Sequence, residues 1–191
     1  MLDKNVPYIE FYMERPEGLV LPSASARSDG FFVRLYEAGD EKHWARIETS
    51  VGEFDKEEDA LNYFAKEFAP QPELLRQRMC FVCTPDNTPV ATCTAWEKHG
   101  RHLLHWVATE PAYQRRGLAR LAVVSALHRY PAGSSVILHT QTWSHAAVRL
   151  YKALGFDLVR DQDTEKALAV LQKVYDTALY EQIKTGLRKS W

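Results

Sequence analysis

Apolar and polar positions along the 191-residue chain predict a series of short strands and helices. Runs of β-branched and aromatic residues predict strands, and apolar positions three or four residues apart predict helices. Strands are expected at residues 5–14, 31–36, 79–84, 89–97, 102–109, 136–140 and 156–159. Helices are expected at residues 40–50, 56–68, 115–129, 144–154 and 164–187, with a short helical turn through Leu74 and Leu75. This order predicts a mixed α/β domain, in which helices cover both faces of a central β-sheet.

Turn-forming and capping residues set the expected boundaries of these elements. Residues 85–89 contain two prolines, an aspartate and an asparagine, so the strands on either side are expected to form a hairpin. Asp40 and Ser144 are expected to cap the helices that follow them, and Gly155 stands just past the end of a helix. The strand at 136–140 shows little alternation, which predicts that both of its faces are covered.

The chain is expected to have one main domain with an extension at each end. Residues 15–30 have the composition of a loop, so residues 1–30 are interpreted as an N-terminal arm and residues 31–160 as the main domain. Residues 161–191 are expected to form a helical extension. Its apolar residues recur every three to five positions, which predicts that one side is buried. That side could pack on its own domain or on a partner, and a homodimer is therefore one arrangement that the sequence allows.

The charge and the apolar runs exclude some classes of function. The formal net charge is −1, which gives no reason to expect a nucleic-acid partner. No apolar run approaches the ~20 residues needed to span a bilayer, and the N-terminus lacks a basic segment followed by an apolar one. We therefore expect a cytoplasmic protein that does not associate with membranes.

The cysteines are expected to be structural. Cys80 and Cys83 have the C-x-x-C spacing, but they lie in a predicted buried strand, where residues three apart point to opposite faces. No second pair of metal ligands follows them. We therefore expect their side chains to fill the core, and we expect no metal site.

The segment between the strand at 102–109 and the helix at 115–129 has the features of an anion site. The first N–H groups of a helix have no partner within it, and together with the helix dipole they favour a bound phosphate. Gly117 lets the backbone come close to such a group, and Arg115 and Arg116 add positive charge. The alternative is an ordinary helix start with a solvated basic turn.

A second segment, at residues 144–156, predicts an amphipathic helix with an inward-facing tyrosine. Ala147, Tyr151 and Leu154 lie near one face, three and four residues apart. Taken alone, this pattern fits a plain core tyrosine equally well.

The two segments, in this order and about thirty residues apart, resemble the signatures of the GNAT superfamily of acyl-CoA-dependent N-acyltransferases. The first signature of that family, Q/R-x-x-G-x-G/A after a strand, is matched by Gln114, Gly117 and Ala119. The second, N-x-x-A-x-x-L-Y-x-x-x-G-F, is matched by Ala147, Leu150, Tyr151, Gly155 and Phe156. The resemblance is firm over residues 102–159 and looser over 31–101, and it does not include residues 1–30 and 160–191.

The chain departs from the family pattern at two points. Ser144 stands where the family usually has asparagine, which leaves open a side-chain contact at that position. The family usually ends with one more strand after the second signature, whereas this chain is expected to continue as a helix. We expect the N-terminal strand at 5–14, or a partner chain, to supply the missing edge.

The resemblance implies binding of acetyl-CoA and direct transfer of its acetyl group to an amine in a ternary complex. It implies that the cofactor lies along the strand at 102–109 and binds its main-chain groups. The cofactor-binding residues expected from the resemblance are Val107, Thr109, Gln114, Arg115, Arg116, Gly117, Leu118, Ala119, Ser144 and Ala147. Tyr151 stands at the position that the family uses to protonate the leaving thiolate, and a tyrosine with a pKa of about 10 carries the necessary proton at neutral pH.

The group that deprotonates the amine is left open by the sequence. An alkylamine has a pKa of about 10.4, like lysine, so a side chain or a water chain must accept its proton. By strand alternation, His105 lies on the face opposite Trp106 and could face the amine. Glu53 is an alternative, and His139 and His145 are further ones.

The acceptor is expected to be a small-molecule amine or a peptide amine, selected by the helices at 40–68. Acidic residues there would attract a cation, although a solvated helix face explains them equally well. They are Glu48, Glu53, Asp55, Glu57, Glu58 and Asp59. Tryptophans could line an acceptor pocket, although at least two are expected in the core. They are Trp44, Trp96, Trp106 and Trp143.

Two other functions stay open. A protein of the same fold could bind CoA as a sensor without turnover, but the tyrosine at position 151 argues against that interpretation. An unrelated nucleotide-binding domain is disfavoured, because the sequence contains no G-x-x-x-x-G-K-[ST] loop and no G-x-G-x-x-G after a strand.

Overall fold

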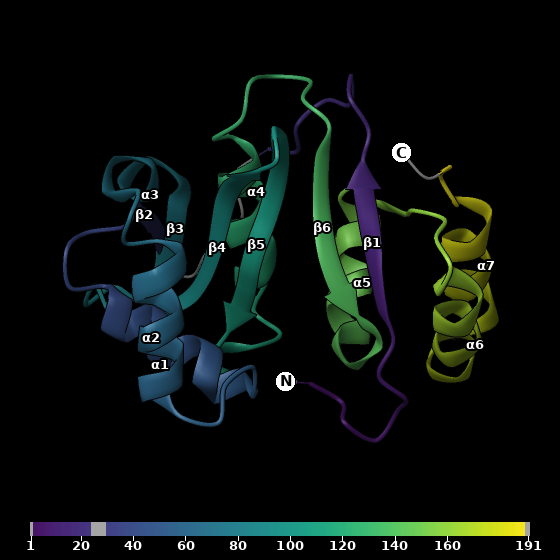
Figure 1. Cartoon of the computed structure of the whole chain (residues 1–191), viewed down its shortest axis with the longest axis horizontal. Helices are drawn as coiled ribbons and strands as arrows, with labels where there is room; N and C mark the ends of the chain where they lie inside the picture. The colour runs from purple at the N-terminus through teal and green to yellow at the C-terminus, as the bar shows by residue number, and fades with distance from the viewer. Residues whose placement is uncertain (1, 24–29, 190–191) are drawn as a thin grey trace. The chain divides into compact units, whose positions relative to one another are not determined.

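The computed structural model describes residues 2–23 and 30–189 (Figure 1). Residues 24–29, which belong to the predicted loop at 15–30, lie outside this description. The chain packs as two compact units, one formed by Leu21–Ala132 and one formed by Leu2–Val20 together with the segment from Gly133 onward. The domain boundaries expected near residues 30 and 160 stay predictions.

The first unit contains an antiparallel sheet in the order β2-β3-β4-β5. Its strands are β2 (Phe32–Leu35), β3 (Met79–Cys83), β4 (Pro89–Lys98) and β5 (Arg101–Thr109). The predicted hairpin is confirmed, since β3 and β4 pair on either side of the proline-containing turn.

Helices cover both faces of this sheet, as predicted (Figure 1). They are α1 (Glu41–Val51), α2 (Glu57–Glu67), α3 (Pro72–Arg78) and α4 (Leu118–Leu127), with a 3₁₀ turn, η1, at Pro111–Tyr113. Side chains from α1, α2 and the facing side of the sheet form one buried aromatic-rich core, in which Trp44 and Ile47 are fully buried. Helix α4 packs on the other face, against β3, β4 and β5.

The second unit contains a three-stranded sheet in the order β6-β1-β7. Its strands are β1 (Glu10–Arg15), β6 (Val136–Gln141) and β7 (Asp157–Leu158). Because β1 runs antiparallel to both neighbours, β6 and β7 run parallel to each other. The N-terminal strand therefore does join the strands of the second signature, as expected, but it lies between two of them instead of at an edge. The mixed α/β class predicted from the sequence is confirmed.

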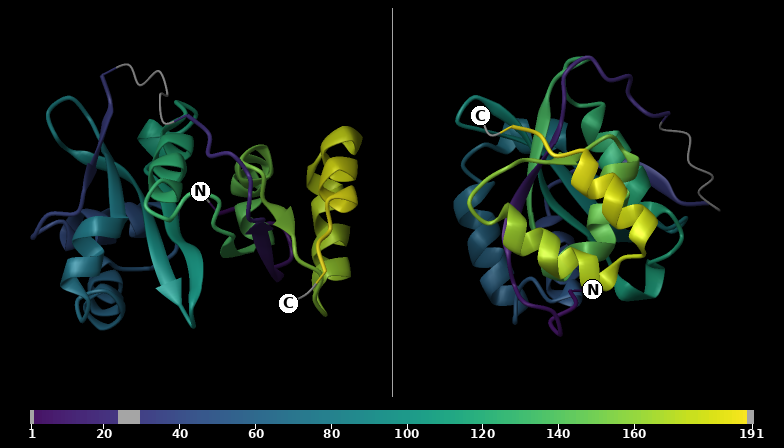
Figure 2. Two further views of the ribbon diagram at one scale, coloured as in Figure 1. Left: turned by 90° about the horizontal axis from the view of Figure 1, so that it is seen from above. Right: turned by 90° about the vertical axis from the view of Figure 1, so that its right-hand side faces the viewer.

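The helices of the second unit differ in one respect from the prediction. They are α5 (His145–Ala153), α6 (Thr164–Val174) and α7 (Thr177–Thr185), preceded by a 3₁₀ turn, η2, at Thr142–Ser144. The prediction of a single helix at 164–187 is wrong, because α6 and α7 are separate helices that pack on one another (Figure 2). Tyr175 is extended at the break, and the Asp176 carboxylate accepts a hydrogen bond from the Leu179 N–H at 2.9 Å to begin α7.

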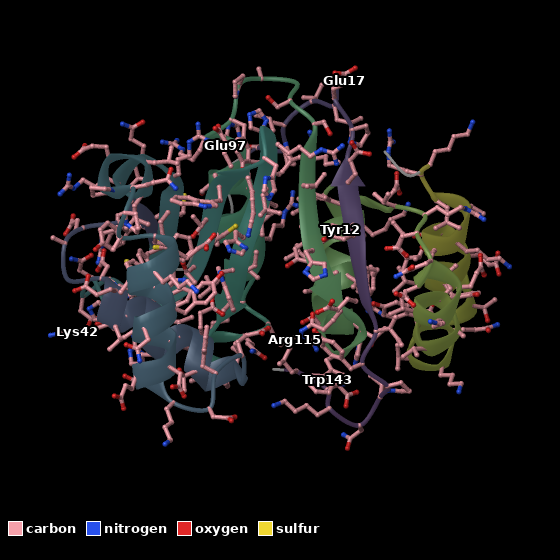
Figure 3. All side chains as sticks on the ribbon, in the orientation of Figure 1. Tyr12, Glu17, Lys42, Glu97, Arg115 and Trp143 are labelled. Carbon is pink, nitrogen blue, oxygen red and sulfur yellow. The ribbon has the colours of Figure 1, made fainter. Side chains whose placement is uncertain are left out.

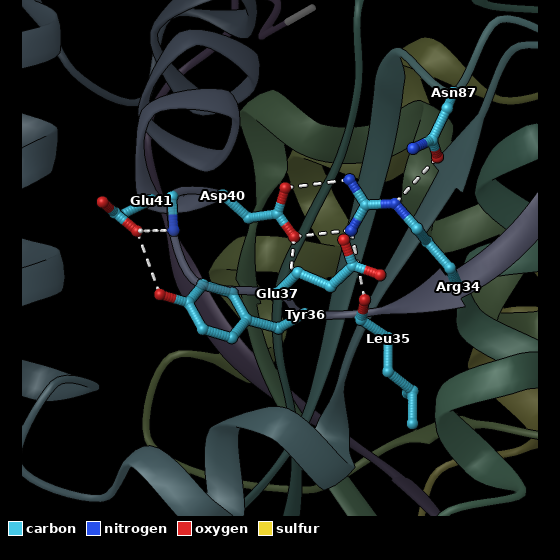
Figure 4. Close-up of polar contacts among 8 residues, drawn as sticks. Arg34, Leu35, Tyr36, Glu37, Asp40, Glu41 and Asn87 are labelled. Carbon is cyan, nitrogen blue, oxygen red and sulfur yellow. Dashed lines mark hydrogen bonds and ion pairs between the residues drawn. The ribbon is translucent and has the colours of Figure 1, made fainter.

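Two predicted helix caps are also wrong. Neither Asp40 nor Ser144 makes a side-chain bond to the helix that follows it. The Asp40 carboxylate instead binds both terminal nitrogens of Arg34, at 2.6 and 2.9 Å, and accepts the Glu37 N–H (Figure 4). A bidentate ion pair joins the carboxylate to a cation through two hydrogen bonds, whereas a capping carboxylate accepts from an uncharged N–H group. The nearby arginine therefore takes the carboxylate and ties β2 to the start of α1.

The strand β6 corrects a further expectation. Its side chains alternate between buried and more exposed positions, with Leu138 buried and His139 exposed. The two faces of the strand are therefore covered to different extents, whereas the sequence predicted that both are covered. The Gly155 prediction is confirmed, since this residue follows α5 with a φ of +88°.

Candidate functional site

The connection between β5 and α4 places backbone N–H groups at the start of a helix. Gly117 is the residue before α4 and has a φ of +80°, a left-handed conformation that favours glycine. No side chain caps the first turn of α4, and the first bond at this end joins the Leu121 N–H to the Gly117 carbonyl. A Cβ atom added at Gly117 would meet no described atom within 4 Å, so the backbone is open on that side. A pyrophosphate group fits these features.

Some side chains of the β5–α4 connection hold the loop in position, and others are exposed to solvent. Gln114 donates from Nε2 to the Thr109 carbonyl at 3.0 Å, which fixes the loop to the end of β5. The Arg116 guanidinium lies over the ring of Tyr113, 5.6 Å from its centroid. Arg115 is exposed, with a left-handed φ of +64° (Figure 3). Leu118 is buried, so only its backbone can reach a bound anion.

A β-bulge interrupts the pairing of β4 with β5. Thr92 pairs with Ala108 and Thr94 pairs with His105, so β5 has one more residue than β4 in this interval. Trp106 lies in the interval and has a φ of +53°. A bulge leaves an extra residue outside the ladder of backbone hydrogen bonds, which suits the expected role of this strand in binding a ligand through its main chain.

The bulge overturns the predicted faces of β5. His105 and Trp106 do not lie on opposite faces, because both contact the same helix. The His105 Nε2 lies 3.3 Å from the Tyr63 hydroxyl, and the Trp106 ring lies 5.0 Å from the Tyr63 ring. Strict alternation fails where the ladder gains a residue, and no pattern in the sequence marks that position.

Aromatic rings gather on the α1–α2 side of the sheet. Trp44 contacts Trp106 at 5.4 Å between ring centroids, and Phe54 stacks on Trp106 at 5.2 Å. Trp96 joins the same core through Phe68. Trp143, also considered for an acceptor pocket, belongs to the other unit and contacts Tyr8 (Figure 3).

A buried carboxyl group lies beside these rings. Glu48 is only 1% exposed, and its Oε1 atom has no hydrogen-bond partner among residues 2–23 and 30–189. Burial, together with the nearby Glu53 carboxylate, raises the pKa of Glu48 well above the ordinary 4.5. Glu53 itself is exposed. Of the two interpretations given for the acidic residues, a solvated helix face does not apply to Glu48, and its position four residues after Trp44 could have indicated burial.

The second signature lies in the other unit, which we describe by itself. Tyr151 is in α5, is 5% exposed, and contacts the Phe156 ring at 6.0 Å. Ser144 and Ala147 are half-buried at the start of this helix. The histidines considered as bases both lie near carboxylates: His139 near Glu10 at 3.7 Å, and His145 near Asp3 at 3.2 Å.

The remaining expectations concern metals and membranes. Cys80, Cys83 and Cys93 are free and buried, as predicted for core residues. Within the described part of the chain, no group of three or more histidine, cysteine or acidic residues could hold a metal ion. None of the described helices has the length and apolar character required to cross a bilayer.

Comparison with known proteins places these features in a family. The model described as the "Acetyltransferase (GNAT) family" matches residues 40–156, which is more than half of the chain. This match includes the β5–α4 connection and the whole of α5. A search of curated proteins finds no match.

Solved structures show a similar fold. A GCN5-related N-acetyltransferase from Sphaerobacter thermophilus is 21% identical with a TM-score of 0.62, and the match covers 80% of this chain and 49% of that one. An acetyltransferase of the GNAT family from Colwellia psychrerythraea is 11% identical with a TM-score of 0.58, covering 80% and 54%. A conserved protein of unknown function from Staphylococcus epidermidis is 11% identical with a TM-score of 0.57, covering 79% and 59%. This chain thus spans about half the length of these structures, and the likeness concerns the fold.

Proposed function

The chain belongs to the GNAT acetyltransferase family, and from this premise we propose that it transfers an acetyl group from acetyl-CoA to a primary amine. The observation that carries the proposal is the uncapped start of α4 at Gly117, which a short connection joins to the bulged strand β5. This arrangement offers free N–H groups for a pyrophosphate and unpaired backbone beside it for the rest of the cofactor. The acceptor is a small-molecule or peptide amine.

Several residues of the β5–α4 connection support the binding of acetyl-CoA. The N–H groups of Gly117, Leu118 and Ala119 would receive the pyrophosphate, and the exposed Arg115 would add positive charge. Gln114 holds the loop in place through its bond to Thr109. The acetyl thioester of bound acetyl-CoA supplies the carbonyl group that a neutral amine attacks.

Tyr151 is the proposed proton donor to the departing thiolate. Its role rests on its position in the second signature, and its side chain is 5% exposed. In the overall reaction a C–N bond forms, the C–S bond breaks, the amine loses one proton and the thiolate gains one. The cytoplasmic location and the homodimer stay predictions.

Calorimetric titration of acetyl-CoA tests the proposal, with Gly117→Asp as the variant. The new carboxylate would repel a pyrophosphate at this position. We expect wild-type protein to bind at about the micromolar level and the variant to lose at least about tenfold in affinity, which corresponds to about 1.4 kcal/mol.

A matched control separates charge at the site from backbone strain. Gly100 has a φ of +74° and, like Gly117, no described atom within 4 Å of an added Cβ. Both aspartate variants therefore incur a similar strain of about 1–2 kcal/mol, but only Gly117→Asp is expected to lose binding. Wild-type protein that does not bind acetyl-CoA, or equal loss in both variants, would refute the proposed cofactor site.

A further inference from the structure

Glu48 lies where helix α1 faces the bulged part of the sheet. Helix α1 packs on β4 and β5, and its buried side chains include Trp44, Ile47 and Glu48. A carboxyl group removed from water is costly unless it is paired or hydrogen-bonded. The Oε1 atom of Glu48 nevertheless has no partner in the described protein.

Two threonine side chains on the same side of the sheet also have buried oxygen atoms without a hydrogen-bond partner among the described residues. Thr92 and Thr94 pair with Phe81 and Met79, which belong to the α1–α2 core, so their side chains point to the α1–α2 side. Their hydroxyl oxygens are buried and, within the described residues, have no hydrogen-bond partner. Buried polar atoms are usually satisfied, so this side of the sheet has the donors and acceptors of a polar ligand site.

Aromatic rings lead from this region to the surface. Trp44 is one helical turn before Glu48 and is fully buried. Its ring touches Phe54, Tyr63 and Trp106, all of which are half-buried. The faces of such rings attract cations, most strongly where water is excluded. An ammonium group is therefore the ligand chemistry that suits the rings and the carboxylate together.

We propose that Glu48 is the group that takes the proton from the acceptor, an alkylammonium compound that binds against the half-buried rings of Phe54, Tyr63 and Trp106. This inference rests on the proposed acetyl transfer. One proton of the ammonium group passes to the Glu48 carboxylate, and the neutral amine attacks the thioester, so that a C–N bond forms and the C–S bond breaks. A second proton leaves the nitrogen and balances the one that the thiolate gains. The Glu48 carboxyl group returns its proton to solvent before the next turnover. Glu48 thereby takes the role for which the sequence offered His105, Glu53, His139 and His145.

The surroundings of Glu48 fit a proton acceptor. A general base is most effective when its pKa is near the working pH, and burial moves the pKa of this carboxyl group upward. The groups that interact electrostatically with this carboxyl group are the Glu53 carboxylate in the α1–α2 loop and the Cys93 thiol on β4. Tyr63 on α2 and His105 on β5 lie on the same side of the sheet. Among the described residues no lysine or arginine lowers the pKa of Glu48, so an ammonium group of the acceptor would be its counter-ion.

The experiment compares two two-carbon amines that differ in protonation. Ethylamine is an ammonium ion at neutral pH, whereas 2,2,2-trifluoroethylamine is largely neutral and needs no deprotonation before it attacks. Glu48→Gln should lower kcat/KM for ethylamine by about 10²-fold or more, and for trifluoroethylamine by less than about tenfold. Glu48→Asp should restore part of the ethylamine rate. Glu165→Gln, an exposed change in the first turn of α6, should leave both rates unchanged.

The outcomes distinguish a failure of the role proposed for Glu48 from a failure of the proposed acetyl transfer. Thermal melts and acetyl-CoA titrations verify that each variant is folded and binds the donor. Equal losses for the two amines, no loss for either, or a wild-type protein that binds acetyl-CoA but acetylates neither amine would overturn the role of Glu48. Wild-type protein that does not bind acetyl-CoA would overturn the proposed function, and the inference with it.

Discussion

At the scale of single residues, the Glu48 carboxyl group links the stability of the fold to pH. Its pKa is raised in the folded protein by burial and by Glu53, relative to the ordinary 4.5. The folded state therefore holds this proton more tightly than the unfolded state does. The resulting stabilisation is fully present below pH 4.5 and is lost as the pH rises through the folded pKa.

Glu48→Gln should remove this dependence. The variant should gain stability relative to wild type as the pH increases, by up to about 1.4 kcal/mol for each pH unit between the unfolded and folded pKa values. Thermal melts of both proteins at about pH 5 and about pH 8 measure the change. Glu57→Gln serves as the control, because its side chain is exposed. A difference between Glu48→Gln and wild type that is the same at both pH values would contradict the prediction.

The sequence predicts single residues well only where local rules decide their environment. Gly155 follows a helix in a left-handed conformation, as glycine commonly does. Asp40 also stands at its predicted position, but Arg34 competes for its carboxylate. The face of His105 was predicted wrongly and the burial of Glu48 was not predicted, for a similar reason: a bulge in β5 and the packing of α1 on the sheet depend on contacts far along the chain.

At the scale of elements, a buried arginine joins β1 to the end of α5. Arg15 is 2% exposed and donates from Nε to the Leu154 carbonyl at 3.1 Å and from Nη2 to the Val20 carbonyl at 2.6 Å. Leu154 is the residue that ends α5, where carbonyl groups lack partners within the helix. The guanidinium group therefore supplies a hydrogen-bond donor to a carbonyl group at the end of α5, which would otherwise have no partner within the helix.

Arg15→Met should destabilise the protein by about 2–3 kcal/mol, because methionine fills the apolar space but leaves two carbonyl groups without a donor. Urea denaturation measures the loss. Arg160→Met, at an exposed position, should change stability by no more than about 0.5 kcal/mol. Similar effects of the two substitutions would show that the carbonyl bonds of Arg15 contribute little.

Periodicity predicted the elements better than it predicted their ends. The strands β3, β4 and β5 and the helices α1 and α2 lie within a few residues of their expected ranges. The break between α6 and α7 was missed because apolar residues continue across it at helical spacing. Asp176 caps α7 and Tyr175 turns extended, and neither residue interrupts the apolar pattern.

At the scale of the whole molecule, the N-terminal segment packs with the C-terminal half of the chain. Residues Leu2–Val20 belong to the same compact unit as β6, α5 and β7. The sequence indicated that a strand was missing after the second signature and that residues 5–14 could supply it. Its place between β6 and β7 could not be predicted, because strand order depends on pairings between residues more than a hundred positions apart.

This arrangement makes one residue of β1 critical for three strands. Met13 is fully buried and pairs with Leu138 on β6 and with Leu158 on β7. Met13→Ala should cost about 2–5 kcal/mol, as expected for truncating a buried side chain. Hydrogen exchange should accelerate at the amides of β6 and β7, with β3 and β4 of the other unit as internal references.

Tyr12→Ala is the matched control for this prediction, since the adjacent side chain points to the opposite face of β1 and is 36% exposed. It should alter exchange in β6 much less, because the side chain that is removed, which contacts the His139 ring, lies outside the core. If Met13→Ala left the exchange of β6 and β7 unchanged, β1 could not be the strand that holds them together. If it accelerates exchange at both, the second signature depends on a segment that begins more than a hundred residues before it, and Tyr151 is positioned by the N-terminal strand as well as by its own helix.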